Sequence, residues 1–349
     1  MGWYPDYTSA LAMAIISLVM WGSWSVSMKL GKITDNNLSL FLLDYAFGTL
    51  FSAIVFAVSL GWTASDSDNS TTLENIEQSK FVSIAYAFIA GFIFNIANTL
   101  LVVGINIAGM AVAFPIGIGL SFAVGTILTY VVQPKADPCF MFSGVGFGVL
   151  AVVAMGTSYH FKLSAEAKKV SEAEEYPPSD KNEAFLANSD GALSSGSEPT
   201  TNAKKRTTMA LVACGVGGCL MGLWSPLNAE ATGHDPGQLN PYSSFFFFVA
   251  AVAVSMPIMS FLVQRFLGSP GKRSFRCGDY CKMSCGQHVW GLLGGVAWAV
   301  GTVFNMISGS IVGCVTILFV LFTQSGLRYK AELTTLFRAL LFLQICCFV

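Results

Sequence analysis

The sequence predicts an all-α integral membrane protein with about ten transmembrane helices in two similar halves. Only 11% of its residues are charged and 54% are hydrophobic, whereas soluble domains carry roughly 25% charged residues. Long charge-free runs recur along the chain, and a helix needs about 20 apolar residues to cross hydrocarbon. The apolar residues are continuous and do not alternate with polar ones, which argues against barrel strands.

The predicted spans follow from the charge-free runs. These runs cover residues 7–28, 45–65, 81–134, 138–161, 207–229, 236–264 and 283–327. The two longest runs have room for two helices each, with breaks predicted near 104–109 and 308–313. Together they give nine spans. The apolar segment 336–349 is a short tenth, below the usual length of a span.

The chain divides into two repeats and a linker. Residues 1–161 form the first predicted five-helix repeat, and 207–349 form the second. The segment 162–206 is rich in Glu, Lys, Ser, Asn and Ala, a composition that cannot bury a core, so we expect a disordered linker. The second repeat is expected to be irregular after 313, because polar residues interrupt it. Either the last two helices of this repeat are short, or the reading frame of this segment is not the native one.

The distribution of basic residues predicts the orientation. Lysines and arginines gather at Lys29 and Lys32, in the linker 162–206 and in 265–282. By the positive-inside rule these segments are cytoplasmic, so the N-terminus is expected outside. The loop 63–79 then faces outward, and its Asn69 begins a glycosylation sequon. We expect a multi-pass protein of the plasma membrane.

Composition and motifs exclude several functions. A net charge of −1 with no basic domain offers no site for nucleic acid, and no phosphate-binding loop is present to drive a nucleotide-powered pump. Cys277, Cys281 and Cys285, followed by His288, make a zinc site or lipidation conceivable. Their spacing fits no established zinc pattern, so an ordinary loop is favoured. We predict no enzyme activity, metal or cofactor, and the sequence leaves the oligomeric state open.

The two halves share short motifs in the same order. Gly22–Ser25 recurs as Gly222–Ser225, and aromatic residues enrich the second span of each half. Gly91–Thr99 likewise matches Gly294–Thr302. Because each half has an odd number of spans, the halves are predicted to be inverted relative to one another. Inverted repeats are typical of alternating-access carriers, although duplicated scaffolds and channels also occur.

Several motifs match a known transporter family. They are Trp21–Trp24, Leu43–Tyr45, Gly125–Tyr130 and Gly156–His160 in the first half, and Ser225–Pro226, Leu267–Pro270 and Trp290–Gly313 in the second. Through them the chain resembles the ureide permeases of the drug/metabolite transporter superfamily. This resemblance implies ten helices in two inverted five-helix repeats, and proton-coupled uptake of allantoin, uracil, xanthine and similar oxo-heterocycles.

Two alternatives to ureide transport stay open. Pro115–Ile116 with Gly119–Leu120 is similar to the bacterial glucose-uptake members of the same superfamily, which would make the chain a sugar carrier. The irregular C-terminal segment also fits a membrane scaffold that does not transport. The partners that we predict are the lipid bilayer, a small-molecule solute and protons.

Asp44 is the candidate for proton coupling. It lies inside the second span, where an ionisable group costs at least about 2.5 kcal/mol on insertion scales and so calls for a functional hypothesis. A desolvated carboxylate there can take up and release a proton. The structural alternative is an ion pair with Lys29 near the end of the first span. Glu230 and His160 lie at predicted helix ends, where polar groups reach water easily.

Polar and aromatic residues on corresponding spans predict a solute site. A flat oxo-heterocycle requires hydrogen-bonding groups and an aromatic face in a mostly apolar pocket. The candidates are Trp24, Ser25, Asn95, Asn98, Thr99, Trp224, Ser225, Asn228, Trp298, Thr302 and Asn305. Pro115 and Pro226 are predicted to break their helices and free carbonyls beside the cavity. Each polar residue alone could instead join helices by a hydrogen bond worth about 0.6 kcal/mol.

Overall fold

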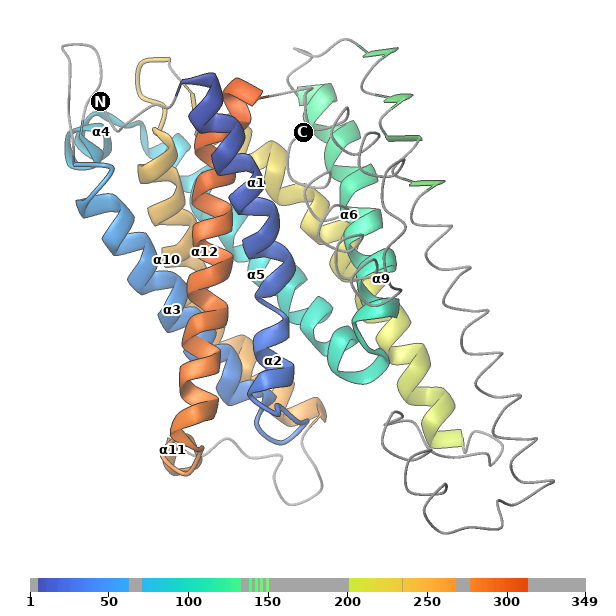
Figure 1. The fold of residues 1–349 in the computed structure, drawn as a ribbon. Helices are drawn as coiled ribbons and strands as arrows, with labels where there is room; N and C mark the ends of the chain where they lie inside the picture. The colour runs from blue at the N-terminus through green and yellow to red at the C-terminus, as the bar shows by residue number, and fades with distance from the viewer. Residues whose placement is uncertain are drawn as a thin grey trace.

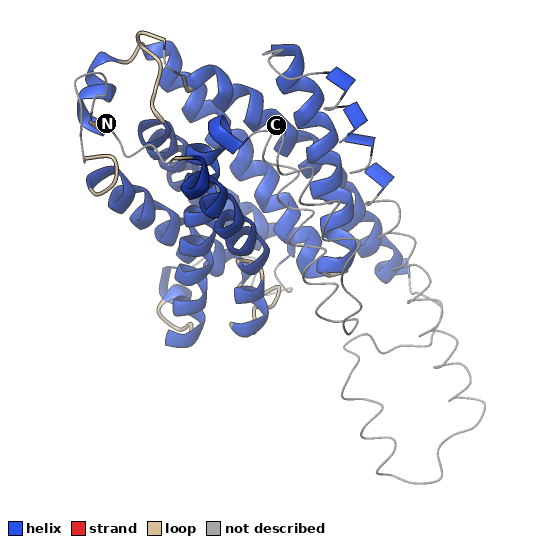
Figure 2. Ribbon diagram, turned by 45° about the horizontal axis from the view of Figure 1, so that its top comes forward, coloured by secondary structure: helices blue, strands red, loops and turns tan. Residues whose placement is uncertain are grey.

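The computed structural model describes residues 6–62, 71–132, four short pieces between 138 and 150, 201–233, 235–267 and 277–312. Every regular element in these residues is a helix (Figures 1 and 2). The described residues contain a single isolated bridge, between Thr232 and Leu239, and no strand. The all-α prediction is therefore confirmed for this part of the chain.

The first half contributes six described helices. They are α1 (Tyr7–Ser23), α2 (Val26–Leu30), α3 (Leu38–Val58), α4 (Thr72–Gln78), α5 (Phe81–Ala108) and α6 (Met110–Val132). The side chain of Asp6 caps α1 by accepting from the Ser9 amide, and Thr71 with Glu74 forms a capping box at α4. Gly109 separates α5 from α6 with a φ of 81°, which glycine adopts readily. The break predicted near 104–109 is confirmed there.

The second half contributes α9 (Thr201–Ala231), α10 (Pro241–Leu267), α11 (Cys277–Tyr280) and α12 (Cys285–Val312). Helix α9 begins at Thr201, so the last residues of the predicted linker belong to a helix. Both α6 and α9 run continuously through their prolines, Pro115 and Pro226. The prediction of helix breaks at these two positions is wrong. A proline removes one backbone hydrogen bond, and a helix in a packed membrane bundle can tolerate that loss.

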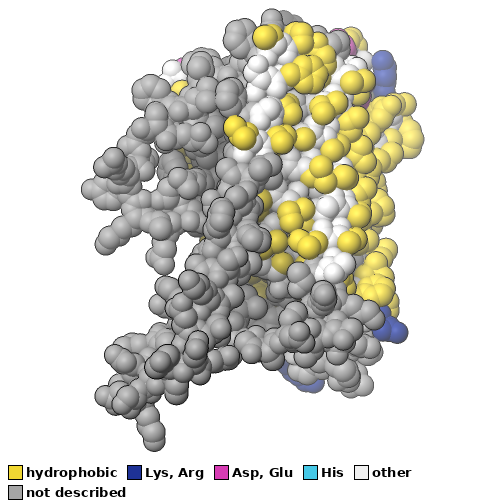
Figure 3. All heavy atoms as spheres, turned by 90° about the vertical axis from the view of Figure 1, so that its right-hand side faces the viewer, with side chains coloured by type: hydrophobic (Ala, Val, Ile, Leu, Met, Phe, Trp, Pro, Cys, Tyr) yellow, Lys and Arg dark blue, Asp and Glu magenta, His cyan; other side chains and the backbone are white. Residues whose placement is uncertain are grey.

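Within the part of the chain that the structure describes, seven helices are long and apolar enough to cross a membrane. They correspond to the runs that begin at 7, 45, 207, 236 and 283 and to both parts of 81–134. The outer surface agrees with a bilayer environment, since exposed large apolar side chains such as Phe51, Val131, Val254 and Phe266 lie along these helices. Figure 3 shows apolar side chains over the length of one face and basic side chains at its ends. The spans predicted beyond 150 and after 313 lie outside the described residues.

Equivalent helices of the two halves pack in the same way. Helix α1 packs on α12 as α9 packs on α5, and α3 packs on α12 as α10 packs on α5. Helices α3 and α10 also pack on each other. The exchange of α1 with α9, α3 with α10 and α5 with α12 therefore preserves these five contacts.

Two glycines bring equivalent helix pairs into backbone contact. A Cβ atom on Gly91 would lie 2.1 Å from the carbonyl oxygen of Phe248, so only glycine lets α5 approach α10 this closely. A Cβ atom on Gly295 would lie at the same 2.1 Å from the carbonyl oxygen of Tyr45, between α12 and α3. Small residues allow such close approach in membrane helix bundles.

Candidate functional site

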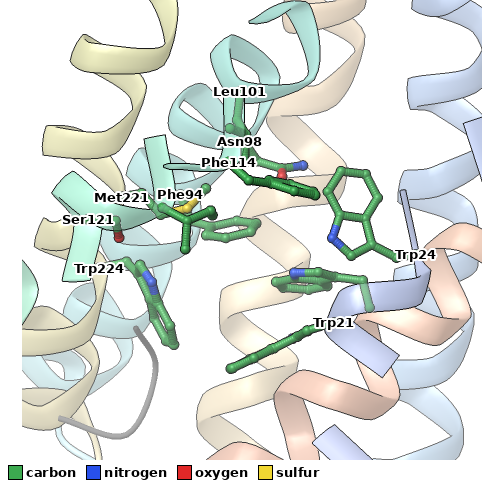
Figure 4. Close-up of a pocket in the computed structure, with 11 residues that line it drawn as sticks. Trp21, Trp24, Phe94, Asn98, Leu101, Phe114, Ser121, Met221 and Trp224 are labelled. Atoms are coloured by element: carbon green, nitrogen blue, oxygen red, sulfur yellow. The ribbon is translucent and has the colours of Figure 1, made fainter. Parts of the chain in front are cut away.

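A cavity opens among five helices near the middle of the bundle (Figure 4). Helices α1 and α12 line one side, and α5, α6 and α9 line the other. Its lining residues are Trp21, Trp24, Phe94, Asn98, Leu101, Phe114, Ile118, Ser121, Met221, Trp224 and Trp298. Apolar side chains dominate this wall, and only a few polar groups reach it, as is usual for small-molecule pockets.

Two aromatic triads border the cavity. In the first, the ring centroid of Tyr45 lies 5.5 Å from that of Trp24 and 6.2 Å from that of Trp298. In the second, the ring of Phe248 lies 5.5 Å from Trp224 and 5.3 Å from Phe94. These spacings fall within the range of attractive aromatic pairs.

The triads meet where Phe94 and Trp298 approach to 4.8 Å. Tyr45 in α3 takes the place in its triad that Phe248 in α10 takes in the other, and α3 corresponds to α10 in the packing. The cavity therefore lies where the two halves join.

Asn98 is the polar residue best placed to meet a solute. It lies on the cavity wall and is 2% exposed, and its side-chain nitrogen has no hydrogen-bond partner. Figure 4 shows its amide beside Phe114 and Trp24. The buried hydroxyl of Tyr45 also has no partner; it lies close enough to interact with Asn98 but outside hydrogen-bond geometry. An unsatisfied buried polar group costs about 1–3 kcal/mol, so a polar solute would gain from pairing with either group.

Two other candidates join helices instead of facing the cavity. Asn95 donates from its side chain to the hydroxyl of Ser255 at 2.7 Å and so links α5 to α10. Thr302 accepts from the indole nitrogen of Trp21 at 3.0 Å and donates to the carbonyl of Trp298 at 2.9 Å. Their hydrogen bonds hold the wall of the cavity in place.

The remaining polar candidates also lie outside the cavity wall. Asn228 accepts from Ser244 at 2.8 Å. Ser25 donates to the sulfur of Met110 at 3.2 Å, between α2 and α6, and Ser225 accepts from Thr129 at 3.4 Å. Thr99 and Asn305 are buried, and each has a side-chain atom without a partner, the Thr99 hydroxyl and the Asn305 side-chain nitrogen.

Asp44 forms a second polar centre at one end of α3. The carboxylate is 1% exposed, and its Oδ2 lies 2.8 Å from Nδ1 of His288. The hydroxyl of Tyr280 donates to its other oxygen. Gly291 permits this pairing, because a Cβ atom there would lie 2.6 Å from the Cβ of Asp44. Helix α12 can therefore approach α3 closely enough for His288 to reach the carboxylate.

The contacts of His288 determine where protons reside. Its Nε2 lies 3.1 Å from the backbone carbonyl of Tyr280, and since a carbonyl only accepts, Nε2 carries a proton. Burial, followed by the contact with Asp44, raises the pKa of the Tyr280 hydroxyl far above its usual value, so this hydroxyl stays protonated and donates. One further proton then lies between Asp44 Oδ2 and His288 Nδ1, because without it a lone pair would face the carboxylate.

The other sequence-predicted residues occupy less central positions. Lys29 is exposed. The carboxylate of Asp44 contacts His288 and Tyr280 and not this lysine. Cys281 and Cys285 are exposed free thiols, and no group of three potential metal ligands is found among the described residues. Glu230 is half-buried near the end of α9. Asn69 and His160 lie outside the described residues.

Sequence reasoning missed several residues of both centres. The sequence analysis groups His288 with the nearby cysteines, although it is a lone histidine near the start of the charge-free run 283–327, and Asp44 is a lone acid directly before the run 45–65. Tyr280 gave no signal, because it lies in the basic loop before α12. Trp21, Phe94 and Phe114 of the cavity are aromatic residues in aromatic-rich spans, and nothing in their spacing separates them from lipid-facing neighbours.

Comparison with known proteins finds relatives in one family of permeases. A sequence model described as Ureide permease matches residues 41–213. Ureide permease 1 of Arabidopsis thaliana is 23% identical over 334 residues, which cover 87% of this chain and 83% of the relative. Probable ureide permease A3 of Vigna unguiculata is 22% identical over 344 residues, covering 87% and 89% respectively. The chain is a relative of the ureide permeases.

This relationship and the seven apolar helices identify a multi-pass integral membrane protein. Ureide permease 4 of Arabidopsis thaliana is 28% identical over 170 residues, 46% of this chain and 40% of the relative. No solved structure matches the chain. The matched region 41–213 includes Asp44, Tyr45, Phe94 and Asn98, so both polar centres fall partly within the part shared with ureide permeases.

Proposed function

We propose that this permease relative carries ureide-type solutes across a membrane by way of the aromatic cavity. The observation that carries the proposal is the buried amide of Asn98, which lies on the cavity wall with its nitrogen unpaired. A flat solute with ring carbonyl and N–H groups would pack against Trp24, Trp224 and Trp298 and pair with Asn98 and Tyr45. The names of the relatives support this solute class over a sugar.

Alternating access through two inverted repeats is part of the proposal. The aromatic triads support it. When α3 is exchanged with α10 and α5 with α12, Tyr45 takes the position of Phe248, and Trp298 takes the position of Phe94. The paired glycines Gly91 and Gly295 obey the same exchange. A solute site at the junction of two repeats is what inverted-repeat carriers use.

Proton coupling would act through Asp44 and His288. The shared proton stabilises the contact between α3 and α12, and its loss leaves an unpaired lone pair against a carboxylate. Release of the proton therefore favours separation of the two helices at this point. Tyr45 follows Asp44 directly in α3, so such a movement would shift a side chain of the first aromatic triad. Protonation and solute contact are thereby linked through one helix.

The orientation completes the proposal. The end that carries Lys29, Lys32 and Arg206 would face the cytoplasm, with the N-terminus outside, as the positive-inside rule predicts. A plasma membrane location is the simplest one for uptake of an external solute.

Uptake by cells that lack their own carriers tests the function. Labelled allantoin, uracil, xanthine and glucose would each be offered at two external pH values. The proposal predicts saturable uptake of at least one oxo-heterocycle, faster at the lower pH, and no uptake of glucose. Uptake of glucose alone would support the sugar carrier. Absence of all uptake by a correctly targeted protein would support the non-transporting scaffold.

A further inference from the structure

Asp35 joins three segments that lie far apart in the sequence. It is in the turn between α2 and α3, and its Oδ2 lies 2.7 Å from the guanidinium of Arg206 in the first turns of α9. Its other oxygen accepts from the side-chain amide of Asn106, near the end of α5. We call Asp35, Asn106 and Arg206 the clasp.

The clasp bridges the two sides of the cavity. Helices α1, α2, α3 and α12 pack on one another and form one group, while α5, α6 and α9 form a second. Within the described part of the chain, α10 is the helix that packs extensively on members of both groups. Asp35 belongs to the first group, and Asn106 and Arg206 belong to the second. The clasp therefore ties the two walls of the cavity together.

The clasp lies at one end of the bundle. In Figure 1, α2, the end of α5 and the start of α9 reach this lower end. Between the cavity and the clasp, the hydroxyl of Ser25 donates to the sulfur of Met110 at 3.2 Å and forms an inner bridge between the same two groups. Trp24, the residue next to Ser25, lines the cavity. A solute leaving toward this end would have to pass both bridges.

The strength of the clasp suits a contact that opens and closes. The Arg206 and Asp35 side chains are 52% and 26% exposed, and an exposed ion pair contributes little to stability. The bond from Asn106 adds a charge-assisted hydrogen bond. A contact of this size biases an equilibrium between conformations without locking it.

We propose that the clasp is the gate that closes this end of the solute path and opens once in each transport cycle. This inference rests on the proposed function only in that a transport cycle requires the gate to open. Closure itself is a property of the protein without solute and can be measured without transport.

Cysteine accessibility tests the gate directly. Ser121→Cys, on the cavity wall, would be made in a chain whose native cysteines are replaced by serine, and its labelling rate measured with a membrane-impermeant maleimide applied from the clasp end of sided vesicles. Asp35→Ala and Arg206→Ala should each raise the labelling rate about fivefold, the factor that ~1 kcal/mol produces. The exchanged pair Asp35→Arg with Arg206→Asp should return the rate toward that of the parent.

Lys282→Ala serves as the matched control. Lys282 pairs with Asp279 in another exposed ion pair at 3.4 Å, and its removal should leave the labelling rate unchanged. Equal labelling of the parent, Asp35→Ala and Arg206→Ala would overturn the gate, as would an equal rise with Lys282→Ala.

A second measurement covers the case in which Ser121→Cys does not fold. Hydrogen exchange in 33–38 of the otherwise unaltered chain should quicken in Asp35→Ala and Arg206→Ala, because the Asn37 and Leu38 amides bond to the Thr34 carbonyl within this turn. Unchanged exchange would equally overturn the gate. A folded chain that transports nothing could still pass either test, so failure of the gate and failure of the transport proposal are separable.

Discussion

Asp44 and His288 form a buried pair, with Oδ2 of the carboxylate 2.8 Å from Nδ1 of the imidazole. The two residues are 244 positions apart and belong to α3 and α12, helices that come from different halves of the chain. Because the backbone carbonyl of Tyr280 fixes a proton on Nε2, the pair shares one further proton. A buried carboxylate–imidazole pair therefore lies directly on the contact between the two halves.

Asp44→Asn should remove the dependence of uptake on external pH. Asparagine keeps the size of the side chain and can still accept from Tyr280, so the protein should fold, but it cannot exchange a proton. Initial uptake rates over a range of pH values measure this effect. Glu77→Gln, which alters an exposed acid in α4, is the matched control and should keep the pH profile. A parental profile in Asp44→Asn would refute proton coupling at this residue.

His288→Ala should destabilise the protein more than the double variant with Asp44→Asn. Removal of one partner strands a buried carboxylate, which costs about 3–5 kcal/mol, whereas removal of both charges does not. Thermal unfolding of the purified variants in detergent would report the order. Additive losses in the double variant would mean that the two side chains do not interact in the folded protein.

Asn98→Leu and Asn95→Leu should separate solute contact from helix contact. Asn98 lines the cavity with its nitrogen unpaired, so Asn98→Leu should raise KM about tenfold while folding is retained, because it deprives a polar solute of a buried partner. Asn95→Leu should instead lower the unfolding temperature, since it removes the bond to Ser255. Equal effects of both variants on KM would place the solute elsewhere.

Gly91→Ala and Gly295→Ala should both destabilise the bundle, by about 1–3 kcal/mol each. In each case the new methyl group would meet a backbone carbonyl at 2.1 Å, so two helices must separate. Gly215→Ala, whose Cβ would have no neighbour within 4 Å, is the control and should be neutral or slightly stabilising. Unfolding temperatures of the three variants decide the matter, and an unperturbed Gly295→Ala would contradict the α3 and α12 contact.

The positions of the spans could be predicted from the sequence because they depend on local composition. The break at Gly109 could be predicted for the same reason, since a glycine there ends one apolar helix and begins another. The start of α9 at Thr201 could not, because a helix can extend past the bilayer into polar sequence. Nor could the continuity of α9 through Pro226, which depends on the packing around it.

The different roles of neighbouring side chains could not be predicted from the sequence. Asn95 and Asn98 are three residues apart on α5, about 60° around a helix, yet one binds α10 and the other faces the cavity. The residues around both asparagines are apolar, so the sequence does not show which one faces the cavity. Only the positions of the adjacent helices distinguish the two side chains. The pairing of Asp44 with His288 likewise requires the contact between α3 and α12.

Uptake by the purified chain in sealed vesicles tests the central claim most directly. Labelled allantoin, uracil and xanthine would be offered with and without an inward proton gradient, to the parent and to Asn98→Leu. We expect saturable uptake of at least one of them, stimulated by the gradient and shifted to higher KM by Asn98→Leu. Uptake that Asn98→Leu leaves unchanged, or no saturable uptake by folded protein, would contradict the central claim.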